Sequence, residues 1–394
     1  MNNIENFINE LKNKKFINSL INNNIEVYLV GGCVRDLVLN KPNKDIDLLV
    51  RLVNIDELIN HLRLFGKVDI VGKSFGVIKF KAKEDNTEYE LALPRKEKPS
   101  GKGGHKGFIV NTDENLSIFD DLVRRDAKIN AMAINLNDGQ LYDPLGGLKD
   151  IENEEISAAN PQAFSDDPLR MLRLIGFASR FDFKIEFETM RMIQENAFRI
   201  NEIAPERILI EFDKIVKKGN PLIAATLLSQ TNLLNHIFYD NLFYKFRFNK
   251  WNKVKTMGEF IYLLSLAGNV NPSDYFKNVL KGDINTYNEI LALEIGAVTN
   301  TLSVGHNRIM ANKMFLLSPQ SLKSDLLTNC MKNACIDLLS DKYPKSLKEL
   351  DINGNDLIQL GLKGKDIGDK LNFLLKSVYY NKVLNKKRKL LKLI

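Results

Sequence analysis

The segment that most constrains the fold is a short apolar run that ends in two glycines. Residues 27–30 (Val-Tyr-Leu-Val) predict a strand, and residues 34–39 predict a short helix. Between them, Gly31 and Gly32 predict a tight turn. A second strand with acids at its start is predicted at residues 46–50. This order of strand, turn, helix and strand indicates a small mixed α/β unit.

Similar patterns extend the α/β unit to about residue 150. Residues 69–83 predict two strands joined by a glycine turn, and residues 88–93 predict another strand. A loop rich in Gly and Lys is expected at residues 96–107. A helix is then expected at residues 123–133 and a strand at residues 133–137.

Helical periodicity dominates after this unit. It is present at residues 167–181, 186–196 and 205–218, and it continues near the end, for example at residues 371–382. Strand patterns are nearly absent there. The predicted fold class is therefore α+β, with a mixed α/β head followed by an all-helical remainder.

Composition narrows the class of protein. The chain has 394 residues, with 56 Lys and Arg against 49 Asp and Glu, and its net charge of +7 suits a polyanionic partner such as nucleic acid. Three widely spaced cysteines oppose a disulfide framework. The sequence shows no apolar run long enough to span a bilayer and no signal-peptide pattern. We therefore expect a cytoplasmic protein without a membrane partner.

The diglycine turn is a candidate phosphate site. Between a strand and a helix, the backbone N–H groups of Gly31 and Gly32 can approach phosphate oxygens closely. Arg35, one turn inside the helix, can grip a triphosphate through its fork of donors. Taken alone, a Gly-Gly pair is more often a plain turn, so this motif needs support from others.

A pair of acids opens the second strand. Asp45 and Asp47 are two residues apart on an extended chain and therefore share one face. Such carboxylates repel unless a cation lies between them, and Mg²⁺ prefers carboxylate oxygens together with substrate phosphates. Glu90, within an apolar strand pattern, is the candidate third carboxylate. The alternatives are a surface acid pair and an exposed strand glutamate.

Two further groups of charges are candidates for nucleotide contacts. Arg125 suits a phosphate, and Asp126 suits a ribose hydroxyl. Asp167, Arg170 and Arg173 share roughly one helix face, where an acid and an arginine can read the edge of cytosine or adenine. The alternatives are the charged first turn of a surface helix and a plain salt bridge between residues three apart.

In this order the four motifs resemble the signatures of class II tRNA nucleotidyltransferases and bacterial poly(A) polymerases. The signatures G-G-x-V-R-D, D-x-D, R-R-D and E-D-x-x-R stand here at residues 31–36, 45–47, 124–126 and 166–170. The likeness continues at residues 143–147, 205–207 and 353–364.

Three departures from the family's pattern bear on nucleotide affinity and fidelity. Asp166 replaces a glutamate, and Gly176 stands where many members have arginine. Ala127 and Lys128 replace an aromatic residue and a threonine.

The resemblance also implies roles for individual residues. It implies that Asp45 and Asp47 bind the metal, that Glu90 completes the catalytic set, and that Asp167 and Arg170 act as the template for C and A. The full set of implied nucleotide-binding residues is Gly31, Gly32, Arg35, Arg125, Asp126, Asp167, Arg170 and Arg173. The implied domains are a nucleotidyltransferase head at residues 1–150, a helical neck at 151–218, a body at 219–320 and a tRNA-binding tail at 321–394.

The implied activity is addition of CCA to the 3′ end of tRNA without a nucleic-acid template. CTP and ATP would be the donors, pyrophosphate the leaving group, Mg²⁺ the cofactor, and the acceptor stem and elbow the bound parts of tRNA. Residues 72–77, 95–108 and 353–364 resemble the CCA-adding type. A poly(A) polymerase, a CC-adding or A-adding partial enzyme, and a catalytically silent RNA-binding protein are the alternatives. The C-terminal half shows no His-Asp pair of the phosphohydrolase kind, which predicts no phosphatase activity.

Overall fold

The protein forms two compact units. The structure, a computed structural model, describes residues 2–42, 45–70, 77–99, 108–238, 248–297, 304–340 and 343–394. The N-terminal unit comprises residues 1–211 and 218–237, and the C-terminal unit comprises residues 212–217 and 238–394. The predicted division into head, neck, body and tail is finer than this and stays a prediction.

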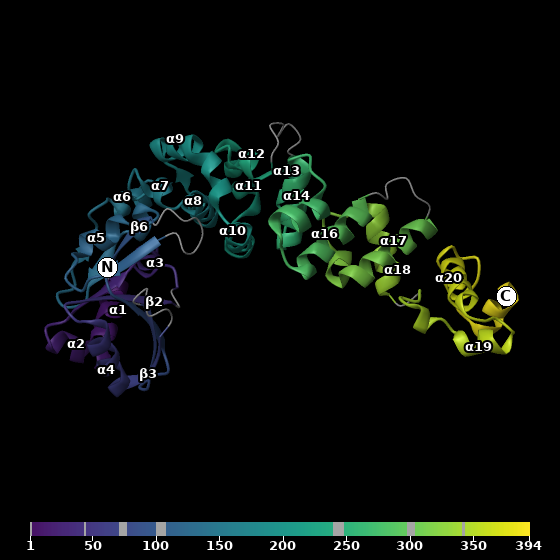
Figure 1. The fold of residues 1–394 in the computed structure, drawn as a ribbon, viewed down its shortest axis with the longest axis horizontal. Helices are drawn as coiled ribbons and strands as arrows, with labels where there is room; N and C mark the ends of the chain where they lie inside the picture. Colours follow the sequence, from purple (N-terminus) through teal and green to yellow (C-terminus); the bar gives the residue numbers. More distant parts are fainter. Residues whose placement is uncertain are drawn as a thin grey trace. The chain divides into compact units, whose positions relative to one another are not determined.

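A seven-stranded sheet forms the centre of the N-terminal unit (Figure 1). Its strands lie in the order β3-β4-β5-β2-β1-β8-β9. Their bounds are β1 (Glu26–Val30), β2 (Ile46–Arg51), β3 (Gly66–Ile70), β4 (Val77–Ala82), β5 (Glu88–Ala92), β8 (Ala133–Asn135) and β9 (Leu141–Tyr142). Among the described pairs of this sheet, β2 and β5 alone run parallel, and their register sets Asp47 directly beside Glu90.

Helices cover one face of the β2–β5 part of this sheet. Helices α1 (Asn2–Lys12), α2 (Lys15–Asn22) and α4 (Ile55–Phe65) lie together beside it (Figure 1). Their apolar side chains pack with Phe80 and Tyr89 in one buried core. Because side chains alternate along a strand, the neighbours of these core residues point to the opposite face. That face therefore carries Asp47 on β2, Glu90 on β5 and the lysines of β4.

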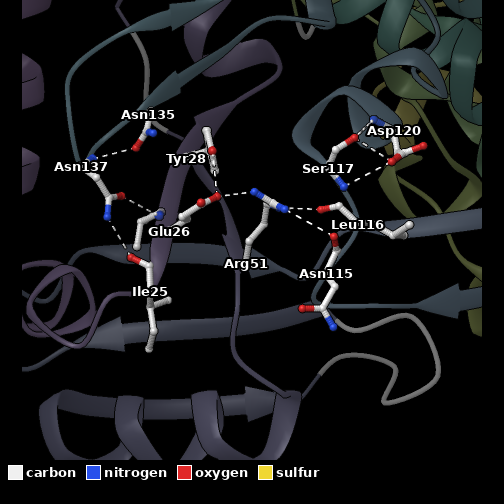
Figure 2. Close-up of polar contacts among 11 residues, drawn as sticks. Ile25, Glu26, Tyr28, Arg51, Asn115, Leu116, Ser117, Asp120, Asn135 and Asn137 are labelled. Carbon is white, nitrogen blue, oxygen red and sulfur yellow. Dashed lines mark hydrogen bonds and ion pairs between the residues drawn. The ribbon is translucent and has the colours of Figure 1, made fainter.

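Polar contacts fasten the end of β2 to the segment that follows strand β7 (Phe108–Thr112), which pairs with β6 (Arg95–Pro99). Figure 2 shows Arg51 donating to the carbonyl oxygens of Leu116 and Asn115 while it pairs with Glu26. The carboxylate of Glu26 also accepts a hydrogen bond of 2.9 Å from the hydroxyl of Tyr28. The return from the β6–β7 hairpin to helix α5 (Ile118–Val123) is thus anchored to the central strands.

The helix predicted at residues 123–133 is wrong. Helix α5 ends at Val123, and only residues 128–130 form a short 3₁₀ turn. The cause is that backbone donors here have other partners: the carboxylate of Asp126 accepts from the N–H of Ala127 at 2.8 Å, and the N–H of Lys128 donates to the carbonyl of Ser157 at 3.0 Å. A short acidic side chain that bonds its own backbone competes with the helix in this way.

Two other predicted boundaries also shift. The predicted loop at residues 96–107 begins as strand β6, which continues to Pro99, while residues 100–107 lie outside the described residues. The predicted glycine turn at residues 71–76 also lies outside them.

Helices follow the sheet, as predicted. They are α6 (Gly147–Glu152), α7 (Ala163–Asp166), α8 (Leu169–Phe181), α9 (Phe187–Asn196), α10 (Pro205–Lys218), α11 (Pro221–Gln230) and α12 (Leu233–Phe238). Strands β10 (Glu155–Ile156) and β11 (Lys184–Ile185) are two residues long. Asp167 precedes α8 in an extended conformation (φ −140°, ψ 102°) and is not inside the predicted helix.

The described part of the C-terminal unit is helical. Its helices are α13 (Phe248–Trp251), α14 (Met257–Ala267), α15 (Pro272–Tyr275), α16 (Ile284–Ala297), α17 (Val304–Leu317), α18 (Asn329–Leu339), α19 (Gly354–Gln359), α20 (Lys365–Tyr379) and α21 (Lys387–Leu390). Helix α16 packs between α14 and α17. Arg308 of α17 donates to the carbonyl of Tyr379 at the end of α20. Across the described ranges, no helix combines the length and apolarity that crossing a membrane requires.

Candidate active site

A cleft of about 630 Å³ in the N-terminal unit gathers most of the predicted site residues. The predicted residues that line it are Gly32, Arg35, Asp47, Glu90, Arg125, Asp126, Asp167, Arg170 and Arg173. Gly31 and Asp45 do not line it. Gly31 is buried within the turn, and Asp45 is exposed just before β2, where it lines a neighbouring hollow.

Two carboxylates form one wall of the cleft. Asp47 and Glu90 are direct neighbours on parallel strands and point to the same face. Burial raises the pKa of Asp47 to about 6, and the negative charge of Glu90 acts in the same direction. Adjacent carboxylates of this kind fit a divalent cation, because a cation between them removes their repulsion. Among the described residues, however, no group of three His, Cys, Asp or Glu side chains is arranged to hold a metal ion.

The diglycine turn needs its glycine for both conformational and steric reasons. Gly31 has a φ of +72°, which L side chains rarely adopt. A Cβ at this position would lie 2.5 Å from Nη1 of Arg125. Helix α3 (Gly32–Val38) starts at once after it. The close approach of Arg125 thus depends on the missing side chain.

Arg35 is held in place by its neighbours. Its side chain is 4% exposed, and its Nε donates to Asp36 at 2.8 Å. Its Nη1 donates to the side-chain oxygen of Asn130, and its guanidinium lies 4.7 Å from the ring centre of Phe181. The predicted phosphate-binding arginine is therefore fixed at the cleft rather than extended into solvent.

A buried acid organises the arginine pair of the R-R-D motif. Asp121 of α5 is fully buried and bonds both Arg124 and Arg125, the latter at 3.0 Å. Burial raises the pKa of Asp121, but Arg125 and Arg124 outweigh burial, and the net shift is downward. The carboxylate therefore stays charged and orients Arg125 toward the cleft.

Asp126 joins two parts of the cleft. It accepts from Nε of Arg173 at 2.7 Å and from the side-chain amide of Asn130 at 3.0 Å. Burial raises the pKa of Asp126, but Arg173 and the hydrogen bonds outweigh burial and lower it overall. Asn130 therefore bridges Arg35, which donates to its oxygen, and Asp126, which accepts from its nitrogen.

Asp167 and Arg170 do not form the plain salt bridge that was the alternative interpretation of this motif. Asp167 accepts from the backbone N–H of Leu169 at 3.1 Å and pairs with Arg207 of α10 at 2.9 Å. Arg170 is 8% exposed and donates to the carbonyl oxygens of Ala163 and Arg124. The acid and the arginine thus reach the cleft separately, each fixed by a different partner.

Sequence reasoning missed several residues of the cleft. They are Arg95, Arg124, Asn130, Phe177 and Arg207. Four of them had a signal in the sequence. Arg95, Arg124 and Arg207 lie in segments 95–108, 124–126 and 205–207, which resemble the family, and Asn130 lies four residues after Asp126. Their functional partners were not readable, since these contacts join residues from distant elements.

Family models match two segments of this chain. The model described as the poly A polymerase head domain matches residues 27–157, which contain the sheet and the carboxylate pair. The model described as the probable RNA and SrmB-binding site of polymerase A matches residues 182–241. These two segments make the chain similar to proteins that carry a poly A polymerase head domain followed by this RNA-binding region.

Curated proteins and solved structures show the same similarity. A protein of Haemophilus ducreyi named Multifunctional CCA protein is 38% identical over 226 residues, which are 56% of this chain and 52% of that protein. The chain therefore matches about half the length of this curated relative. The Thermotoga maritima CCA-adding enzyme complexed with tRNA-CCA is 27% identical, with a TM-score of 0.66 over 95% of this chain and 90% of that one.

A second solved structure matches similarly. The complex of a CCA-adding enzyme with CTP is 26% identical, and its TM-score is 0.69 over 96% of this chain and 94% of that one. The likeness to these solved structures therefore covers both units. The match to the poly A polymerase head domain implies a dependence on a divalent metal.

Proposed function

We propose that the chain adds C, C and A in turn to the 3′ end of tRNA in the cytoplasm, using CTP and ATP as donors. The observation that carries this proposal is the cleft itself. In it, a carboxylate pair faces fixed arginines for a triphosphate and a separate acid and arginine for a base. The CCA-adding relatives bound to tRNA and to CTP support the choice of substrates.

The cofactor in this proposal is Mg²⁺, held by Asp45, just before β2, and by Asp47, with Glu90 beside Asp47 as the third carboxylate. When bound, it supplies positive charge to the attacking oxygen and to the departing pyrophosphate. The 3′ oxygen of the tRNA forms a bond to the α-phosphorus as the bond to the bridging oxygen of pyrophosphate breaks, and the hydroxyl proton leaves to solvent. The chain's own residues bind and orient the two reactants for this displacement.

The arginines bind the triphosphate in this proposal. Arg125, set by Asp121, and Arg35, set by Asp36, present donors in fixed directions. Groups held before the substrate arrives lose little freedom on binding, which favours the reactive alignment. Asp126, to which Arg173 donates, is the residue that the proposal assigns to the ribose.

The base is read by Asp167 and Arg170. The carboxylate of Asp167 can accept from the exocyclic amine that cytosine and adenine share, and uracil lacks this amine. Arg207 keeps the carboxylate oriented. The helical neck, body and tail predicted from the sequence would hold tRNA by shape and phosphate contacts.

The deciding experiment uses purified protein, Mg²⁺ and labelled tRNA that lacks its CCA end. CTP alone should add two residues, and a third should appear only when ATP is also present, with growth stopping there. Asp47→Asn is the matched negative control. A long ladder with ATP alone would instead identify a poly(A) polymerase, the activity suggested by the head-domain match. Two C residues without A would identify a CC-adding enzyme, and no incorporation would contradict catalysis.

A further inference from the structure

A second hollow of about 650 Å³ adjoins the cleft. It shares Asp47 and Glu90 with the cleft, and Asp45 also lines it. The remaining walls include Lys67, Lys79 and Lys81, from strands that the cleft barely uses. The carboxylate pair therefore faces two separate spaces. Nucleotidyl transfer needs two reactants to meet at one point, so the second space requires an occupant.

Strand register defines how the lysines lie relative to the carboxylates. In one row across four strands, Asp47 is beside Glu90, Glu90 beside Lys79, and Lys79 beside Asp69. Since neighbouring strands are about 4.8 Å apart, the backbone of Lys79 is roughly 10 Å from that of Asp47. A lysine side chain from this position reaches the space next to the carboxylates.

The next row repeats the pattern two residues away. Glu88 on β5 is beside Lys81 on β4, and Lys81 is beside Lys67 on β3. This row lies on the same face, opposite the helix-covered core. The basic side chains thus run along the sheet away from the carboxylates.

The lysines of the second hollow are exposed. Lys79 and Lys81 are exposed residues, and within the described part of the chain neither forms an ion pair. Lys67 pairs with Asp69 at 3.2 Å, but its side chain is 75% exposed. Asp69 and Glu88 also line the hollow. When divalent cations neutralise Asp45, Asp47 and Glu90, the three lysines therefore exceed the remaining two acids by one charge. Ammonium groups on flexible stems suit a phosphate chain whose sequence is not read.

We propose that the second hollow binds the 3′-terminal nucleotides of the acceptor RNA, with Lys79 and Lys81 on backbone phosphates and the terminal hydroxyl at Asp47 and Glu90. This inference rests on the proposed function, because it assigns the cleft to the nucleoside triphosphate. The RNA then approaches across β4 and β5, and the two reactants meet at the carboxylate pair from opposite sides.

The test compares a double variant, Lys79→Gln with Lys81→Gln, to the wild-type full chain. We expect the KM for tRNA lacking CCA to rise about tenfold, while the KM for CTP stays within about twofold. The slope of log KM for tRNA against log salt concentration should fall by about 1 for each lysine removed. Lys83→Gln is the matched control, since Lys83 is exposed beyond the end of β4 and does not line the hollow.

A charge-reversed pair, Lys79→Glu with Lys81→Glu, should raise the KM for tRNA further. Unchanged KM and salt slope for tRNA in both double variants, each with the thermal stability of the wild type, would overturn the inference. A change in pyrophosphate inhibition without a change for tRNA would overturn it too and assign the hollow to the leaving group. Failure of the proposed function is distinguishable, because the wild type itself would then not extend tRNA.

Discussion

The two hollows that meet at Asp47 and Glu90 are built in opposite ways. In the cleft, guanidinium groups are fixed by acids, as with Arg125 on the fully buried Asp121 and Arg173 on Asp126, or by backbone carbonyls, as with Arg170. In the second hollow, the ammonium groups of β4 stand exposed on a sheet face. A rigid arrangement suits one small ligand in one pose, whereas exposed lysines tolerate a chain of phosphates in several. Under the proposed function, the difference teaches that one carboxylate pair can serve both a selective binding side and an unselective one.

The largest effect is expected where the two hollows overlap. Asp47→Asn removes a carboxylate that belongs to both, so neither side can compensate for it. We expect kcat to fall about 1000-fold, equivalent to roughly 4 kcal/mol, while binding of CTP and of tRNA changes only a few-fold. Steady-state incorporation and separate binding titrations measure these. Asp56→Asn, at an exposed position in α4, is the control. A kcat within tenfold of the wild-type value would contradict the prediction that both hollows depend on Asp47.

The rigidity of the cleft is tested by Asp121→Asn. This change leaves Arg124 and Arg125 without their buried acid, and breaking such a pair should cost about 3 kcal/mol of folding free energy. Asp213→Asn, in a surface pair with Lys217, should cost at most about 0.5 kcal/mol. Urea unfolding at pH 7 gives both values. Equal costs for the two variants would mean that the cleft is no more rigid than the surface.

The Asp121→Asn variant also tests how the free energy of unfolding depends on pH. The pKa of Asp121 in the folded protein is lower than its ordinary value of 3.8, because Arg125 and Arg124 outweigh burial. A group with a lowered folded pKa stabilises the protein above its unfolded pKa, and that contribution is lost as the pH falls through the folded pKa. The stability gap between wild type and Asp121→Asn should therefore stay constant from pH 7 to about 5 and narrow below about 3.8. A gap that widens below that pH would contradict the assignment.

Asn130 sharpens the comparison within the cleft. Asn130→Asp keeps the acceptor for Arg35 but loses the donor to Asp126 and places two like charges together. We expect the KM for CTP to rise about tenfold, with the KM for tRNA unchanged. Asn135→Asp is the control, because Asn135 is 7% exposed against 8% for Asn130 and bonds the backbone of Asn137 outside the cleft (Figure 2). An equal rise in the KM for tRNA would show that the cleft and the second hollow do not act independently.

The smallest effect concerns base selection. Arg207 pairs with Asp167, and their side chains are only 18% and 17% exposed. A lysine at position 207 keeps the positive charge of this pair, so a small effect is expected. Arg207→Lys should reduce the preference for CTP over UTP about two- to fivefold, as measured by competitive incorporation, because a lysine cannot hold the carboxylate in one orientation. Arg199→Lys, whose partner Glu202 lies outside the cleft, is the control. An unchanged preference would separate Arg207 from base selection.

Local chemistry made much of this arrangement predictable. The period of two along a strand was enough to place Asp47 and Glu90 within their strands, and the α+β class followed from periodicity along the chain. The turn at residues 124–130 was not predictable, because its backbone hydrogen bonds go to Asp126 and Ser157 and not along a helix.

Contacts between residues far apart in the chain could not be predicted from the sequence. Register between β2 and β5 depends on a crossover connection, and no local pattern determines which residue of one strand lies beside which residue of the other. The pairing of Asp167 with Arg207, 40 positions away, likewise follows from how α8 and α10 are placed, so the sequence suggested a local salt bridge instead.

The parallel pairing of β2 with β5 has a consequence for the order of assembly. Asp47 and Glu90 become neighbours only when β5 pairs with β2 across the intervening α4, β3 and β4, and closing such non-local contacts slows folding. During synthesis the N-terminal residues leave the ribosome first. A nascent chain that has released β5 but not α8 and α10 would present the carboxylates without Asp167, Arg173 or Arg207. If the proposed function holds, each chain would therefore become able to bind the metal during synthesis before it becomes able to select the base.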